Sequence, residues 1–283
     1  MKKEEIELDL LLDALYRLTG YEFRQYMRSS LHRRVKNRLS IEGLPTISRL
    51  TEKIIHDITF RDKLLGDFSI NVTEMFRDPL FFKEIREQVL PNMKDLPEIR
   101  IWHAGCSTGE EAYSMAILME EEGLIDRVKI YATDMNEVVL KVAEEGRFSL
   151  QKMQSYTRNY LQAGGKHSFS EYYTTDREGA YLLPRLRDRI TFAQHNLVTD
   201  GSFNEFHMII CRNVLIYFNR DLQLQVLHLF NNSLSKSGFL GLGSKEAIHS
   251  DISFLEEFEA KQKIYRKNPT LILEYRVLFQ GRE

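Results

Sequence analysis

Polar residues and glycines follow several apolar runs of this sequence, at the points where the runs end. The run IRIWHA leads into a loop from Gly105 to Gly109, and the run YAT leads into Asp134. Asn196 ends a third run, and Arg212 with Asn213 ends a fourth. If the runs are parallel strands, their carboxyl ends meet at one sheet edge, where such folds bind nucleotide-like ligands. The spacing therefore predicts one binding crevice.

The loop after the first run has the wrong residues for a dinucleotide. Gly105 and Gly109 permit close approach of the backbone, but Ser107 and Glu110 stand where the G-x-G-x-x-G pattern has its second and third glycines. Glu110 and Glu111 also place carboxylates at the start of a predicted helix, where they would repel a diphosphate. The loop therefore favours a cationic ligand over a nicotinamide dinucleotide.

A cation that carries a ribose fits the other strand ends. Asp134 lies about 25 residues beyond Gly109, where acidic residues of related folds accept hydrogen bonds from both ribose hydroxyls. The amide of Asn196 could pair with an adenine edge. Together these groups predict S-adenosylmethionine as the cofactor. Two ordinary alternatives stay open, a helix cap for Asp134 and a turn residue for Asn196.

The elements that must position these residues follow from the spacing of apolar side chains. Helical spacing predicts helices over residues 4–18, 23–39, 46–57 and 59–68, and hence an all-helical N-terminal domain, residues 1–74. Beyond residue 97, apolar runs alternate with helical segments, which predicts a Rossmann-like α/β domain over residues 75–283. Residues 147–187 break this alternation, so we expect an inserted subdomain there.

Composition excludes several classes of protein. A hydrophobic fraction of 43% and a mean hydropathy of −0.36 are typical of a soluble globular protein. No apolar run approaches the roughly 20 residues that cross a bilayer, and the start MKKEEIELDL lacks the apolar centre of a signal peptide. We therefore expect a cytoplasmic protein with no direct membrane insertion. Two cysteines form no disulfide framework, and His103 and His195 have no metal-ligand spacing.

Five motifs occur in the order NVTEMFRD, GCSTGEEAYS, TDMN, HNL and CRNVLIYF. With them the chain resembles, over nearly its whole length, the CheR family of chemoreceptor glutamate methyltransferases. The resemblance implies methyl transfer from S-adenosylmethionine to receptor glutamates, which leaves glutamate 5-O-methyl esters and S-adenosylhomocysteine. It also implies a small helical domain ahead of a Rossmann-like S-adenosylmethionine-dependent methyltransferase domain, with a β-rich insertion.

The resemblance also assigns site residues. Met75 and Ala112 depart from the aromatic residue and the proline usual in the family, and both exchanges are expected to affect packing alone. Which of Glu110 and Glu111 faces the cofactor stays open. The residues expected around the cofactor, which include Gly105 of the glycine loop, are Asn71, Thr73, Arg77, Gly105, Glu110, Glu111, Asp134, Asn196, Leu197, Asn213 and Val214.

The implied chemistry requires few catalytic groups. A glutamate carboxylate has a pKa of about 4.3, so it is ionised at neutral pH and needs no general base. Arg77 could hold a carboxylate by a bidentate pair, and Tyr217 could hydrogen-bond near the transfer path. The alternatives are a surface ion pair of Arg77 with Asp78 or Glu74, and a core role for Tyr217. A signalling scaffold that keeps the fold without methyl transfer is the second hypothesis.

The predicted helix over residues 23–39 is strongly basic, which favours steering of a glutamate-rich helical partner. A solvated charged face is the alternative. Nucleic acid is disfavoured because the net charge is −2 and stacking platforms are missing. In some members of the family that the chain resembles, the insertion grips a receptor's C-terminal pentapeptide. The segment TTDREG is shorter and less glycine-rich than such members require, so we expect no tight binding of that peptide. The expected substrate-binding residues are Arg24, Arg28, Arg33, Arg34, Lys36 and Arg38.

Overall fold

A computed structural model describes residues 3–69, 72–250 and 252–268 of the chain. The chain divides into two units, Met1–Ile70 with Leu215–Val226, and Asn71–Val214 with Leu227–Glu283. The first unit thus includes a segment from far along the sequence. The expected domain boundary at residues 74 and 75 stays a prediction. None of the helices in the described ranges is long and apolar enough to cross a membrane.

The first unit is built from helices whose ends are set by local hydrogen bonds. Thr46 Oγ1 accepts from the backbone N–H of Arg49 at 3.3 Å, and the Asp57 carboxylate accepts from that of Phe60 at 3.0 Å. Gly43, with φ 65°, ends the second helix in the left-handed conformation. The helices are α1 (Lys3–Thr19), α2 (Arg28–Glu42), α3 (Ile47–His56) and α4 (Ile58–Phe68). The all-helical N-terminal domain is therefore confirmed.

The predicted start of the basic helix was wrong. The pattern predicted a helix from Phe23, but α2 begins at Arg28. Tertiary contacts within the first unit account for the difference, since the Met27 N–H donates to the Tyr217 carbonyl at 2.7 Å and Tyr26 forms an isolated β-bridge with Phe218. Residues 23–27 are therefore irregular, and Arg24 is not on the helix.

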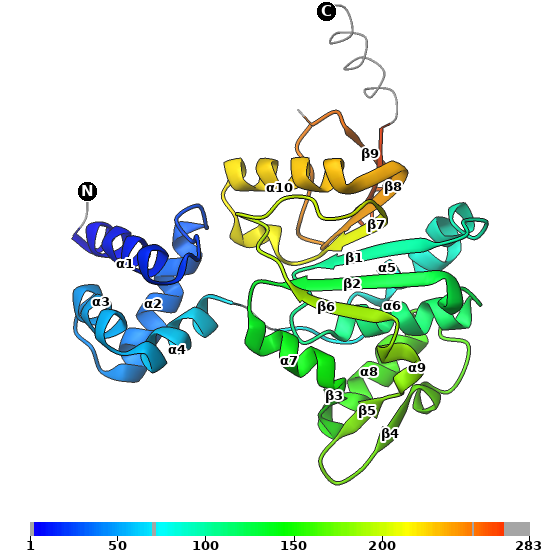
Figure 1. The fold of residues 1–283 in the computed structure, drawn as a ribbon, viewed down its shortest axis with the longest axis horizontal. Coiled ribbons are helices and arrows are strands. Elements are labelled where there is room, and N and C mark those ends of the chain that lie inside the picture. Colours follow the sequence, from blue (N-terminus) through cyan, green and yellow to red (C-terminus); the bar gives the residue numbers. More distant parts are fainter. Residues whose placement is uncertain (1–2, 70–71, 251, 269–283) are drawn as a thin grey trace, which may run out of the picture. The chain divides into compact units, whose positions relative to one another are not determined.

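A mostly parallel seven-stranded sheet forms the second unit (Figure 1). The strands that surround the predicted crevice, β2, β1 and β7, are neighbours and parallel, and β1 pairs Ile99–Ala104 with Val128–Thr133 of β2. Strand β10 pairs antiparallel with β8 on one side and with β9 on the other. In spatial order the strands are β6 (Ile190–Gln194), β2 (Val128–Asp134), β1 (Ile99–Ala104), β7 (Phe206–Cys211), β8 (Leu234–Leu242), β10 (Ile264–Lys267) and β9 (Leu255–Glu259).

Helices cover this sheet on both faces. Figure 1 shows α6 and α7 on one side of the sheet, and the part of α10 that belongs to this unit on the other. Trp102 of β1 is fully buried, and its indole N–H donates to Thr133 Oγ1 of β2 at 2.8 Å. The covering helices are α5 (Pro79–Glu84), α6 (Glu110–Glu121), α7 (Glu137–Glu145) and α10 (Arg220–Ser233). The predicted α/β class is confirmed, whereas the β9–β10 hairpin was not predicted.

The insertion holds the small antiparallel sheet that was predicted, together with a helix that was not. Strands β3 (Arg147–Phe148), β5 (Ala180–Leu182) and β4 (Tyr173–Thr175) form the sheet, and a turn over residues 176–179 joins β4 to β5. Helix α8 (Leu150–Gln162) is the longest element of the insertion, and Ser149 Oγ caps it by accepting from the Gln151 N–H at 3.3 Å. A short helix, α9 (Pro184–Arg187), completes it.

A buried carboxylate attaches the insertion to α6. Glu121, with a fully buried side chain, accepts from the hydroxyls of Tyr160 and Tyr172 and from the Lys166 N–H, and it pairs with Arg86. Burial raises the pKa of Glu121, but the hydrogen bonds from Tyr160 and Arg86 outweigh burial, so its pKa lies below the ordinary value. The ionised carboxylate therefore stabilises this junction.

Glu121→Gln should lower the free energy of unfolding by about 2–4 kcal/mol at pH 7, because an amide group would face buried donors. Since the folded-state pKa of Glu121 is lowered from 4.5, the carboxylate stabilises the fold above that pH. The difference between wild type and variant should shrink as the pH falls below 4.5. Urea unfolding at several pH values measures it.

Glu120→Gln is the matched control, because Glu120 lies beside Glu121 and pairs with the half-exposed Arg185. It should change the free energy of unfolding by no more than about 1 kcal/mol. Equal effects of the two substitutions would contradict the role given to Glu121.

Candidate functional site

The predicted crevice lies where the strand order reverses. From β1 the chain continues to β2 and β6 on one side, whereas β7 and β8 lie on the other side of β1. The loops after β1 and β7 therefore meet, and a Cβ atom on Gly105 would lie 2.6 Å from Val214 Cγ2. Gly105 also has φ 80°, so glycine alone fits both the space and the conformation. Ligands of open α/β sheets bind at such a reversal.

Non-glycine residues in the left-handed region occur in both loops. Ser107 has φ 52° and Asn213 has φ 62°. Hydrogen bonds hold these conformations, since the Ser107 N–H donates to Asp134 at 2.9 Å and the Asn213 N–H donates to Glu246 at 3.0 Å. Strained backbone of this kind clusters at ligand-binding sites.

Asp134, which ends β2, is prepared to accept more hydrogen bonds. Its Oδ2 accepts from the Ser107 N–H at 2.9 Å and its Oδ1 from the Asn136 N–H at 3.0 Å, and the Met135 N–H also hydrogen-bonds to the carboxylate. An ionised carboxylate has about four lone pairs, so it can accept a further hydrogen bond. Burial raises the pKa of Asp134, and these backbone hydrogen bonds oppose that rise. The N-cap of α7 is Asn136, so the helix-cap alternative for Asp134 was wrong.

The turn after β6 lies beside Asp134. The His195 N–H donates to the Asp134 carbonyl at 3.2 Å. Asn196 Oδ1 accepts from the Val198 N–H at 3.0 Å, which is the turn role left open for this residue. Leu197 is buried. The structure thus brings Asn196 and Leu197 to the crevice, while a contact of either with the cofactor stays a prediction.

The two adjacent glutamates of α6 have different surroundings. Glu110 is 1% exposed, and it accepts from Thr108 Oγ1 at 2.5 Å and from the Tyr156 hydroxyl of α8 at 3.1 Å. Glu110 therefore joins the crevice loop to the insertion. Both Met75 and Ala112, the two departures from the family pattern, are fully buried, as expected for packing positions.

Glu111 points instead to a buried cation. His103 Nδ1 lies 3.0 Å from Glu111 Oε1, and Arg212 Nη1 donates to Glu111 Oε2 at 3.1 Å. Burial raises the pKa of Glu111, but the hydrogen bond with His103 and the charge of Arg212 outweigh burial and lower it. Glu111 is therefore ionised, and each of its oxygens has a partner within the protein.

The Arg212 guanidinium connects this glutamate to the NVTEMFRD segment. It donates to the Arg77 carbonyl at 3.1 Å, pairs with the Asp78 carboxylate, and stacks on the Phe81 ring at 4.2 Å. Sequence reasoning placed Arg212 at a strand end without giving it a role. The position of Arg212 within the motif CRNVLIYF was the feature of the sequence that could have indicated such a role.

Glu246 is a second residue that sequence reasoning missed. Its buried Oε2 accepts from the N–H groups of Gly243 at 2.6 Å and Asn213 at 3.0 Å, so it joins the loops after β8 and β7. A glutamate shortly after the last parallel run, GFLGLG, was the only signal for it.

The predicted reacting groups are placed as follows. Arg77 Nη1 donates to the Val72 carbonyl at 3.0 Å, and no carboxylate of the described residues forms an ion pair with Arg77. The surface ion pair with Asp78 or Glu74 is therefore wrong. Thr73 is half-buried at the start of this segment. Asn71 lies outside the described residues.

Tyr217 belongs to the first unit, in the segment Leu215–Val226. There the Arg34 guanidinium lies over its ring, 5.1 Å from the centroid. Its role near the transfer path stays a prediction.

The crevice residues fit S-adenosylmethionine on two observations. The Asp134 carboxylate has about four lone pairs, more than the backbone N–H groups of Ser107, Met135 and Asn136 use, so it can accept from a ribose hydroxyl. Ser107 Oγ, in the glycine loop, is buried and has no hydrogen-bond partner among the described residues, as expected where a polar ligand group is to be bound. In the same ranges no group of three or more His, Cys, Asp and Glu side chains could hold a metal ion.

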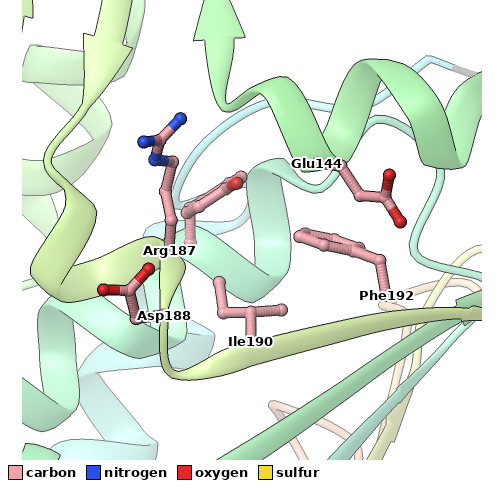
Figure 2. A pocket seen from close by; sticks show the side chains of 6 residues that line it. Glu144, Arg187, Asp188, Ile190 and Phe192 are labelled. Carbon is pink, nitrogen blue, oxygen red and sulfur yellow. The ribbon is translucent and has the colours of Figure 1, made fainter.

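A pocket of about 430 Å³ lies beside the end of the glycine loop, since a Cβ atom on Gly109 would lie 3.2 Å from Tyr113 and 3.3 Å from Phe192, which line the pocket (Figure 2). Arg187 of α9 lies on one side of it, and Glu144 of α7 and Phe192 of β6 lie on the other. Its lining residues are Tyr113, Glu144, Arg187, Asp188, Ile190 and Phe192, none of which was predicted as a site residue.

Comparisons with known proteins cover both units. Residues 71–264 match the family described as CheR methyltransferase, SAM binding domain, and residues 6–69 match the CheR methyltransferase, all-alpha domain. A Pseudomonas putida relative named Cher3, assigned by its name to the methyltransferases without a stated substrate, is 46% identical over 94% of this chain and 98% of its own length. The chemotaxis protein methyltransferase of Listeria monocytogenes is 29% identical over 85% of this chain and 92% of its own.

Asp134→Ala should weaken binding of S-adenosylmethionine and S-adenosylhomocysteine alike, because both carry the same ribose. Loss of two charge-assisted hydrogen bonds corresponds to about 2–4 kcal/mol, or tens- to hundreds-fold in affinity. Calorimetry with each ligand measures the change.

Asp126→Ala removes an exposed carboxylate that pairs with Arg189, and it should leave both affinities unchanged. If Asp134→Ala folds normally and binds either ligand as tightly as wild type does, Asp134 does not hold the ribose.

Proposed function

Because this chain belongs to the CheR methyltransferase family, we propose that it methylates glutamate side-chain carboxylates of a chemoreceptor or related signalling protein, which yields glutamate 5-O-methyl esters. The observation that carries the proposal is the environment of Arg77. Its backbone is held by the buried Arg212, while its own guanidinium has no carboxylate partner among the described residues. Its guanidinium has five N–H donors, and the donation from Nη1 to the Val72 carbonyl leaves others that can bind a carboxylate by two parallel hydrogen bonds.

The residues of the crevice bind the cofactor and orient it toward the substrate carboxylate. S-adenosylmethionine supplies an electrophilic methyl group on a positively charged sulfur. Asp134 would accept the ribose hydroxyls, and the Gly105 loop with Val214 would cover one side of the ligand. A substrate carboxylate is ionised at neutral pH, so no side chain has to remove a proton. Positioning of the two reactants and exclusion of water then supply the rate enhancement.

The partner and the location follow from the same proposal. The substrate is a glutamate-rich helical region of a signalling protein, and the enzyme acts in the cytoplasm. The turn over residues 176–179 is closed by hydrogen bonds of the Glu178 and Gly179 N–H groups to Asp176 Oδ1, at 2.7 and 3.0 Å. A short closed turn supports the absence of a tight tether for a C-terminal pentapeptide.

Transfer of a labelled methyl group into a receptor cytoplasmic fragment tests the proposal. Label should enter the fragment, should be released as methanol in mild base as an ester requires, and should be lost when the acceptor glutamates are replaced by glutamine. Absence of label despite normal cofactor binding would favour a scaffold without methyl transfer. Label that survives base would exclude an ester.

Arg77→Lys should lower kcat by about tenfold or more while the fold is retained, because lysine keeps the charge but loses the fork that binds two oxygens at once. Steady-state methylation kinetics measure it. Arg189→Lys, an exposed arginine paired with Asp126, is the control and should be neutral. Normal turnover in both Arg77→Lys and Arg77→Ala would remove Arg77 from the site.

A further inference from the structure

The basic side chains expected to bind substrate are not all available. Arg34 is half-buried, and its Nη1 donates to the carbonyls of Asp67 and Phe68 at 2.8 and 2.7 Å. Arg38 binds both oxygens of the Asp67 carboxylate and also pairs with Glu42. These two arginines hold α2 against the end of α4. They belong to the fold of the first unit rather than to a free surface.

Three of the remaining cations form ion pairs with α1. Lys36 lies 3.2 Å from Glu4, Arg28 lies 2.5 Å from Asp9, and Arg24 lies 3.5 Å from Asp13. The third pair is shared, because Arg24 Nε also donates to Glu22 at 2.9 Å and Asp13 lies 2.9 Å from Arg17. We call Glu4, Asp9 and Asp13 the acidic series, and Arg24, Arg28 and Lys36 the basic series. The side chains of these pairs are 39–60% exposed, so solvent and other charges reach them.

The order of the pairs shows how a helix can lie along these cations. As α1 advances through the acidic series, its partners step backwards along the chain from Lys36 to Arg24. Because the side chains of Arg24, Arg28 and Lys36 are still 40%, 50% and 60% exposed, an acidic helix that lies alongside α1 can reach the same cations. The carboxylates of α1 occupy the same donors that glutamates of a partner helix would need. Arg33 is exposed and, within the described ranges, forms no ion pair, so it is accessible to such a partner from the start.

We propose that α1 is an intramolecular competitor for the glutamate-bearing helix that this enzyme methylates. The acidic series masks the basic series, and a partner helix docks by exchanging its own carboxylates for those of α1. This inference rests on the proposed function, because it takes the partner to be the substrate. Exposed ion pairs are weak, each changing an equilibrium by up to about fivefold, so exchange is feasible. The core of α1, built from Leu8, Leu11, Leu12 and Leu15, stays in place.

Neutralising the acidic series tests the competition. Glu4→Gln, Asp9→Asn and Asp13→Asn combined should tighten binding of an acidic helix by about tenfold, because each exposed pair contributes up to about fivefold. The probe is a fluorescein-labelled, alanine-based helical peptide with several glutamates, and its glutamine counterpart should not bind. Fluorescence anisotropy at rising salt measures affinity, and tightening should fade as salt screens the charges. The affinity for S-adenosylmethionine should not change.

Single substitutions provide a matched comparison. Asp9→Asn and Glu52→Gln each remove one carboxylate from an exposed ion pair of the first unit, since Glu52 pairs with Arg49 of α3 at 2.8 Å. Asp9→Asn should tighten peptide binding by up to about fivefold, and Glu52→Gln should have no effect. Circular dichroism verifies that α1 remains folded in each variant. If the triple variant does not fold, Asp9→Asn alone tests the competition.

The peptide measurement would overturn the inference if Asp9→Asn left the affinity unchanged, or if Glu52→Gln tightened binding equally. Peptide binding is measured without methyl transfer, so its outcome is separate from that of the proposed function. An enzyme that methylates a receptor fragment with the same KM in wild type and Asp9→Asn would keep its function and refute the competition.

Discussion

The buried guanidinium of Arg212 is the interaction on which the rest of the site depends. Its side chain is 1% exposed, and it joins the end of β7 to Glu111 of α6 and to the backbone at Arg77. A buried pair broken by loss of one partner costs about 3–5 kcal/mol, since the other charge is left uncompensated. The position of the backbone at Arg77 and the ionisation of Glu111 are therefore properties of one network.

The crevice was predictable because burial on both sheet faces leaves continuous apolar runs. IRIWHA, for example, forms β1 with the same bounds, and the residues that follow such runs meet at the strand ends. The sequence did not show that Glu110 and Glu111 have different partners. Adjacent residues of a helix point about 100° apart, and their partners, Tyr156 and Arg212, lie far away along the chain.

The elements that sequence reasoning missed depend on contacts between distant segments. Residues 23–27 carry a helical apolar pattern, yet Tyr217 and Phe218 hold them in an irregular form. Helix α8 is an exception, because Met153, Tyr156 and Tyr160 are buried at helical spacing and Ser149 supplies an ordinary cap, so the sequence contained a signal for it. The charge of α2 was evident, whereas its neutralisation by α1 required the position of both helices. Spacing within one segment contains no information on such pairs.

A double-mutant cycle between Arg212 and Asp78 tests the central claim most directly. Arg212→Lys, Asp78→Asn and the combined variant are compared with wild type by kcat/KM for methyl transfer. If the Arg212 network positions the reacting segment, the double variant will be less impaired than the sum of the single effects, with a coupling energy of about 1 kcal/mol or more. Strictly additive effects would show that Arg212 and Asp78 act independently and would contradict the account.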